Sequence, residues 1–132
     1  MSRKHPIISI TGSSGAGTTS VKRTFEQIFR REKVVAAYIE GDAFHRYNRA
    51  EMRTRMAEES DKGNRHFSHF SPETNLFAEL ESVFRSYGET GTGTTRYYVH
   101  DDTESALHGV PPGTFTDWQP LPENSDLLFY EG

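Results

Sequence analysis

Three nearly continuous apolar runs mark the chain, and a stretch with helical spacing separates the first two. The runs cover residues 6–11, 34–40 and 126–130, and such runs are typical of buried parallel strands. Between the first two, apolar residues recur as one buried helix face at Val21, Phe25, Ile28 and Phe29. The order strand, helix, strand predicts a βαβ unit. We therefore expect an α/β fold with a mostly parallel sheet.

The middle of the chain predicts two further helices. A charged stretch over 46–62 predicts a solvent-facing helix or lid, whose only apolar stripe is Met52 and Met56. Ser71 and Pro72 predict the N-cap and first turn of the next helix, and Gly88 predicts its end. This helix is expected to bury its apolar side chains: Leu76, Phe77, Leu80, Val83, Phe84 and Tyr87.

The segment before the last strand carries weaker signals. Residues 96–100 resemble a strand, and residues 101–123 form a turn-rich segment in which Trp118 is the expected anchor. A length of 132 residues is close to the common size of one domain. We expect a single domain over residues 1–132, and the thin apolar content (33%) suggests an incomplete sheet.

Composition narrows the functional classes. The net charge of −4 argues against a surface dominated by nucleic-acid binding. The absence of cysteine excludes disulfides and thiol catalysis in this sequence. No apolar run approaches the ~20 residues that span a bilayer, and the N-terminal segment lacks the apolar core of a signal peptide. We therefore expect a cytoplasmic protein that acts without a membrane.

A glycine-rich turn follows the first strand and opens the first helix. Gly12, Gly15 and Gly17 permit a close backbone approach to an anion, and a helix N-terminus favours negative charge. Thr19 occupies the position whose hydroxyl coordinates Mg²⁺ in phosphate-binding loops, whereas Thr18 stands where lysine is usual. The alternative is an ordinary glycine turn. The candidate nucleotide-binding residues are Gly12, Ser13, Ser14, Gly15, Ala16, Gly17, Thr18, Thr19 and Ser20.

Two carboxylates follow predicted strands. Asp42 comes just after the second strand, beside the expected phosphate loop, and is a candidate general base for phosphoryl transfer. It is also a candidate N-cap for the next helix. Glu131 ends the last strand after four hydrophobic residues, which is typical of the carboxylate that reaches Mg²⁺ beside such a loop. A surface glutamate at a strand end is the alternative.

Cationic and aromatic side chains near these carboxylates are candidates for acceptor binding. His45, Arg46 and Arg49 are spaced to lie on one side of a helix or turn, where they would suit a phosphorylated acceptor or form a solvated basic face. Tyr98 and His100, with Asp101, are candidates to line the acceptor pocket, although an aromatic edge strand has the same pattern. The spacing of His66, His69 and His100 does not suit structural zinc, and the sequence has no cysteine.

Several blocks of sequence closely resemble the bacterial phosphoribulokinases of the phosphoribulokinase/uridine kinase family. They lie at residues 12–18, 40–46, 67–70, 96–102, 115–118 and 128–132, so the resemblance covers nearly the whole chain. It implies a P-loop kinase fold whose loop lacks the standard lysine. It also implies an ATP- and Mg²⁺-dependent reaction that converts ribulose 5-phosphate to ribulose 1,5-bisphosphate in the Calvin cycle.

Carried over by residue, the resemblance implies that Asp42 is the base, that His45 and Arg49 bind ribulose 5-phosphate, and that Glu131 associates with the metal. It ties Arg31 to regulation by metabolites, and it implies a homo-oligomer and an NADH effector. The family continues beyond the equivalent of Gly132, so we expect an amino-terminal part of a longer domain. The alternatives are a uridine-kinase-like enzyme and a truncated, non-catalytic nucleotide-binding protein.

Overall fold

The computed structural model describes residues 4–12, 17–63, 67–68 and 71–132, without the side chains of Thr18 and Thr19. These residues form two compact units. The first, which we call the sheet unit, comprises Met1–Gly41, Glu81–Thr95 and Trp118–Gly132. The second, the helical unit, comprises Asp42–Leu80 and Arg96–Asp117. The single domain expected over 1–132 stays a prediction.

A three-stranded parallel sheet forms the centre of the sheet unit, as the apolar runs predict. The last strand in the chain lies between the other two, so the strand order is β1-β5-β2. Ile8 of β1 and Tyr38 of β2 both pair with Phe129 of β5. The strands are β1 (Ile7–Ile10), β2 (Ala36–Glu40) and β5 (Leu127–Glu131).

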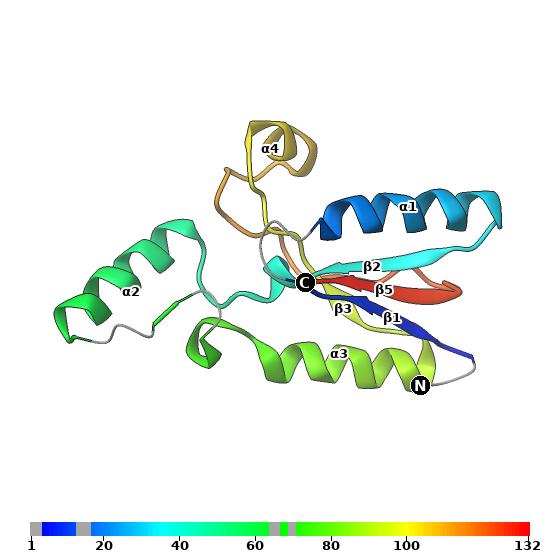
Figure 1. Ribbon diagram of the computed structural model, residues 1–132, viewed down its shortest axis with the longest axis horizontal. Helices are drawn as coiled ribbons and strands as arrows, with labels where there is room; N and C mark the ends of the chain where they lie inside the picture. Colours follow the sequence, from blue (N-terminus) through cyan, green and yellow to red (C-terminus); the bar gives the residue numbers. More distant parts are fainter. Residues whose placement is uncertain (1–3, 13–16, 64–66, 69–70) are drawn as a thin grey trace. The chain divides into compact units, whose positions relative to one another are not determined.

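Alternation along β5 directs its aromatic side chains to the two faces of the sheet. Figure 1 shows helix α1 (Thr18–Arg31) along one face and helix α3 (Phe77–Thr90) along the other. Phe129 is fully buried and packs against Phe25 and Phe29 of α1, with ring centroids 5.3 and 6.0 Å away. Tyr130 meets Phe84 of α3 in an edge-to-face contact at 5.3 Å. The central strand therefore organises both layers.

Helix α1 buries less of its apolar stripe than the spacing predicts. Phe29 is buried, but Val21 is 39% exposed and Ile28 is 37% exposed. At about 100° per residue, Val21 and Ile28 both lie on one side of the line along which Phe25 and Phe29 contact Phe129. The expectation of one fully buried face is therefore wrong at these two residues.

In the helical unit, helix α2 (Arg49–Asp61) begins three residues later than expected. Asn48 is its N-cap and accepts a hydrogen bond from the Glu51 backbone at 2.9 Å, while the Glu51 carboxylate accepts from Asn48 N at 3.1 Å. This capping box fixes the helix start. Met52 is buried and Met56 is exposed, so the expected stripe contributes one side chain to the core.

The expected helix from Pro72 to Tyr87 is two elements. A 3₁₀ turn, η2 (Pro72–Thr74), is followed by an extended Asn75 and then by α3. The backbone breaks there because Arg46 N donates to Thr74 O and Leu76 N donates to Phe44 O, both at 2.7 Å. Continuous helical bonding would remove both of these bonds.

Helix α3 also passes through Gly88 and ends before Gly91, which has a φ of +73°. A glycine inside a helix costs only about 1 kcal/mol, which the Tyr87 side chain offsets by its complete burial. Phe77 was expected in the core, but it is 53% exposed at the first turn of the helix.

The segment after α3 differs most from its prediction. Residues 96–100 do not form a strand: Tyr98 makes a single antiparallel bridge with Phe115. A short helix, α4 (Asp102–His108), begins after the N-cap Asp101. Trp118 is 44% exposed, so it is not the expected anchor. In the sheet unit, β3 (Thr94–Thr95) pairs antiparallel with β4 (Gln119–Pro120).

Among the helices of the described residues, none combines the length and the apolar character needed to cross a membrane.

Candidate active site

In the helical unit, Asp42 lies in the short 3₁₀ helix η1 (Gly41–Phe44). One side chain, that of Arg96, holds the backbone just after it. The Arg96 guanidinium donates to Ala43 O at 2.8 Å and to His45 O at 2.7 Å, and lies 3.7 Å from the centroid of the Phe115 ring. Burial lowers the pKa of Arg96, although an arginine stays protonated near neutral pH. Arg96 thus fixes the path of the chain on which Asp42 and His45 are carried.

Two histidines flank the Asp42 carboxylate. Nε2 of His100 lies 3.0 Å from Oδ2, and Nε2 of His45 lies 3.9 Å from Oδ1. His100 thus contacts the candidate base directly, and it is not among the residues that line the cavity beside α2, where it was expected. Asp42 itself is 54% exposed at its side chain, so it is open to a substrate hydroxyl.

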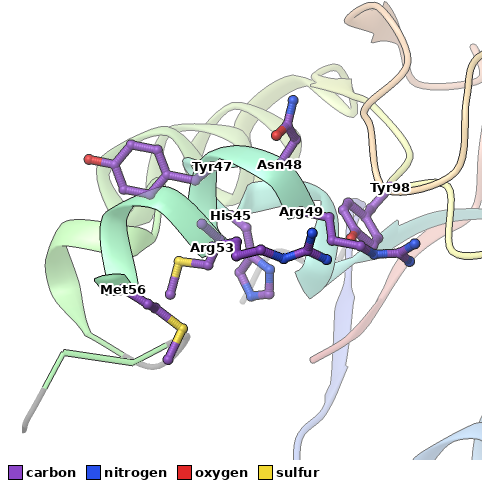
Figure 2. A pocket seen from close by; sticks show the side chains of 8 residues that line it. His45, Tyr47, Asn48, Arg49, Arg53, Met56 and Tyr98 are labelled. Carbon is purple, nitrogen blue, oxygen red and sulfur yellow. The ribbon is translucent and has the colours of Figure 1, made fainter. Parts of the chain in front are cut away.

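A cavity of about 350 Å³ lies beside the start of α2 (Figure 2). Three of the candidate acceptor-binding residues line it: His45, Arg49 and Tyr98. Arg53 adds a second guanidinium one helical turn after Arg49, and Figure 2 shows both side chains extending from the same side of α2. A cavity with two arginines and a histidine suits a small anionic ligand such as a phosphate ester.

Arg49 is placed by contacts with a loop of its own unit. Its backbone N–H donates to Gly113 O at 2.8 Å, and its Nη2 donates to His100 O at 2.8 Å. Gly113 has a φ of +81°, and a Cβ there would meet Arg49 Cβ at 2.8 Å, so only glycine fits. Arg46, by contrast, bonds Glu73 O through Nε at 3.0 Å and does not line the cavity. Of the three cationic residues expected at the acceptor site, only His45 and Arg49 line the cavity.

In the sheet unit, the described ends of the glycine-rich loop fit an anion site. Gly17 is the N-cap of α1 with a φ of +83°, and no side chain caps the helix. The first turn of α1 holds no acidic residue, so its N–H groups and dipole favour a phosphate. Ser13, Ser14, Gly15 and Ala16 lie outside the described residues, whereas Thr18, Thr19 and Ser20 begin α1.

Glu131 ends β5 at the carboxyl edge of the sheet. It lies in register with Ile10 of β1 and Glu40 of β2, and Gly12 N of the loop donates to Gly132 O at 3.4 Å. The described residues hold no cluster of three or more metal-binding side chains. One carboxylate near a phosphate loop fits Mg²⁺, which usually keeps several waters and binds substrate phosphates. The expected closeness of Asp42 to this loop stays a prediction.

Four contributing residues were not singled out from the sequence. Arg53 has a signal, because it follows Arg49 at the spacing of one helix face. Glu104 follows His100 by four residues, but the intervening helix was not expected. Asn48 begins a capping pattern with Glu51 that predicts the start of α2. Nothing local marks Arg96, since its partners lie about fifty residues earlier.

Comparisons with known proteins identify relatives of the chain. Phosphoribulokinase from Nitrobacter vulgaris is 94% identical over all 132 residues, which are 46% of that protein. The chromosomal phosphoribulokinase of Cupriavidus necator is 65% identical over the same residues, 45% of its length. The solved phosphoribulokinase from Rhodobacter spheroides matches with a TM-score of 0.86 and 57% identity, over 99% of this chain and 44% of that one.

The chain therefore spans a little under half the length of these relatives. The structural match confirms the expected α/β fold with a parallel sheet as that of a P-loop kinase. The family model described as "Phosphoribulokinase / Uridine kinase family" matches residues 7–132. The chain belongs to the phosphoribulokinase/uridine kinase family.

Proposed function

We propose that the protein carrying this chain transfers the γ-phosphoryl group of ATP to ribulose 5-phosphate and forms ribulose 1,5-bisphosphate. The observation that carries the proposal is the cluster in the helical unit. There, an exposed carboxylate, Asp42, lies 3.9 Å from His45, which lines a cavity together with two arginines. The names of the relatives support the same reaction.

Asp42 acts as the general base. The acceptor hydroxyl gives its proton to a carboxylate oxygen as its own oxygen bonds to phosphorus and the bond from phosphorus to the leaving ADP oxygen breaks. The carboxylate is held by His100 on one oxygen, so the other oxygen is the one to receive the proton. An exposed position permits the proton to pass to solvent afterwards.

Arg49, Arg53 and His45 bind the phosphate that the acceptor already carries. Guanidinium groups bind phosphate through paired N–H bonds, and two of them lie on one face of α2. Tyr98 provides an aromatic wall to the same cavity. This arrangement favours a phosphorylated sugar over an uncharged nucleoside, which offers no negative charge to the two guanidinium groups.

The loop from Gly12 to Ser20 holds the phosphates of ATP, with Thr19 and Glu131 near Mg²⁺. When bound, the metal neutralises charge on the phosphates. The left-handed Gly17 and the uncapped start of α1 support this assignment. The homo-oligomer, the NADH effector, the link of Arg31 to regulation and the cytoplasmic location stay predictions.

An acceptor comparison tests the proposal. The protein is incubated with MgATP and either ribulose 5-phosphate or uridine, and ADP formation is followed together with the phosphorylated product. We expect turnover with ribulose 5-phosphate alone. Turnover of uridine alone would instead identify a nucleoside kinase. ATP binding without transfer to either acceptor would identify a non-catalytic nucleotide-binding protein.

A further inference from the structure

His100 lies between two carboxylates of the helical unit. Its Nε2 is 3.0 Å from Asp42 Oδ2, and its Nδ1 is 3.0 Å from Glu104 Oε2. The same Glu104 oxygen accepts the backbone N–H of His100 at 2.7 Å. Glu104 is in turn held by the start of α4, where its backbone N–H donates to the Asp101 carboxylate at 2.9 Å. The ring is therefore oriented at both nitrogens.

An imidazole can donate from both nitrogens only when it is protonated. Burial would lower the pKa of His100, but the hydrogen bonds to Asp42 and Glu104 and their negative charges outweigh it and raise the pKa from 6.5. Among the described residues, the Tyr98 side chain lies edge-on to the ring at 4.8 Å and the Arg49 guanidinium binds the His100 carbonyl. His45 faces the other oxygen of the same Asp42 carboxylate at 3.9 Å. The protonated ring therefore persists to a higher pH than an isolated histidine.

The contacts among Asp42, His100 and Glu104 orient these side chains more than they stabilise the fold. Those of His100 and Glu104 are 42% and 39% exposed, and ion pairs at such sites are usually worth less than about 1 kcal/mol. Yet together they fix one oxygen of Asp42, at a position 58 residues earlier in the chain than His100. A base whose free oxygen is held in one direction reacts more often than one that rotates.

We propose that Glu104 is a positioning residue for Asp42 and acts through His100. Glu104 keeps the ring protonated and oriented, and His100 holds Oδ2. Oδ1 is left on the His45 side to take the hydroxyl proton. The catalytic part of this proposal rests on the proposed function. The interaction between Glu104 and His100 does not depend on the proposed function, because it is measured without turnover.

Glu104→Gln tests the proposal, because glutamine keeps the size and an accepting oxygen but removes the charge. Asp102→Asn is the matched control, since Asp102 is exposed in the same first turn of α4. An NMR titration follows the His100 ring, identified by the signal that His100→Gln removes. We expect Glu104→Gln to move the His100 midpoint to lower pH, whereas Asp102→Asn leaves it near its original value. Matched unfolding midpoints establish that both variants are folded.

The kinetic arm uses the same two variants with MgATP and ribulose 5-phosphate. We expect Glu104→Gln to lower kcat about 10-fold, less than the ~10²–10⁴-fold effect of losing a general base, with KM nearly unchanged. The alkaline limb of the kcat profile should move to lower pH together with the His100 midpoint.

Two results would overturn the positioning role: a His100 midpoint that Glu104→Gln leaves in place, or a midpoint that moves while the kcat profile stays fixed. Failure of the proposed function gives a different result, which is no transfer to ribulose 5-phosphate by the unaltered protein. The titration would then still decide whether Glu104 holds His100, and the catalytic part would be overturned with the function.

Discussion

Nε2 of His100 and Oδ2 of Asp42 lie 3.0 Å apart across 58 residues of sequence. Asp42 precedes α2, whereas His100 precedes α4, so the contact joins the two segments of the helical unit. Two residues predicted separately as base and as acceptor-binding group are thus one hydrogen-bonded pair. We therefore expect both stability and activity to depend on the protonation of His100.

Stability should depend on pH through His100. The pKa of His100 is raised above 6.5 in the fold, so its contribution is complete below pH 6.5 and is lost as pH rises through the folded-state pKa. Because the pair is partly exposed, we expect less than about 1 kcal/mol. Urea unfolding at several pH values measures it. The difference between the unaltered protein and His100→Gln should shrink above that pKa, and a constant difference would contradict the account.

Arg49→Ala should raise the KM for ribulose 5-phosphate roughly 10- to 100-fold, as expected for loss of a hydrogen bond to a charged group. Since Arg49 also binds His100 O, a smaller fall in kcat should accompany it. Steady-state kinetics at saturating ATP separates the two parameters. Arg85→Ala is the control, because Arg85 is an exposed arginine on α3. An unchanged KM would show that Arg49 does not bind ribulose 5-phosphate and has only a structural role.

Arg96→Lys should destabilise the protein by about 2 kcal/mol and also lower kcat. Lysine keeps the charge, but its ammonium group cannot bridge Ala43 O and His45 O while stacking on Phe115. Chemical denaturation checks the first effect and the acceptor assay the second. Arg85→Lys, the same exchange at an exposed site, should leave both quantities unchanged. Equal behaviour of the two variants would show that Arg96 does not hold the Asp42 segment.

The strands of the sheet could be predicted from the sequence because each is a nearly continuous apolar run, which is recognisable from its own residues alone. The order β1-β5-β2 could not, since no local pattern says which strands pair across the chain. Likewise, Gly88 looks like a helix end, but α3 continues because Tyr87 gains more from burial than the glycine costs.

The candidate site was predictable where residues follow a strand or lie on a helix. Asp42 and His45 come after β2, and Arg49 begins α2. The site was not predictable where a contact joins distant segments. Arg96 and Glu104 matter only because the chain returns to η1 after α3, and α4 is too short to give a periodic pattern. For the same reason, the sequence pattern indicates only a pocket wall for His100 and does not reveal its bond to Asp42.

The central claim is that Asp42 takes the hydroxyl proton in phosphoryl transfer from ATP to ribulose 5-phosphate. The most direct measurement follows ³²P from [γ-³²P]ATP into ribulose 1,5-bisphosphate, with the unaltered protein and with Asp42→Asn. We expect labelled bisphosphate from the first and a rate about 10²- to 10⁴-fold lower from the second, at equal ATP affinity. A loss of only a few-fold, or no labelled bisphosphate from the unaltered protein, would contradict the account.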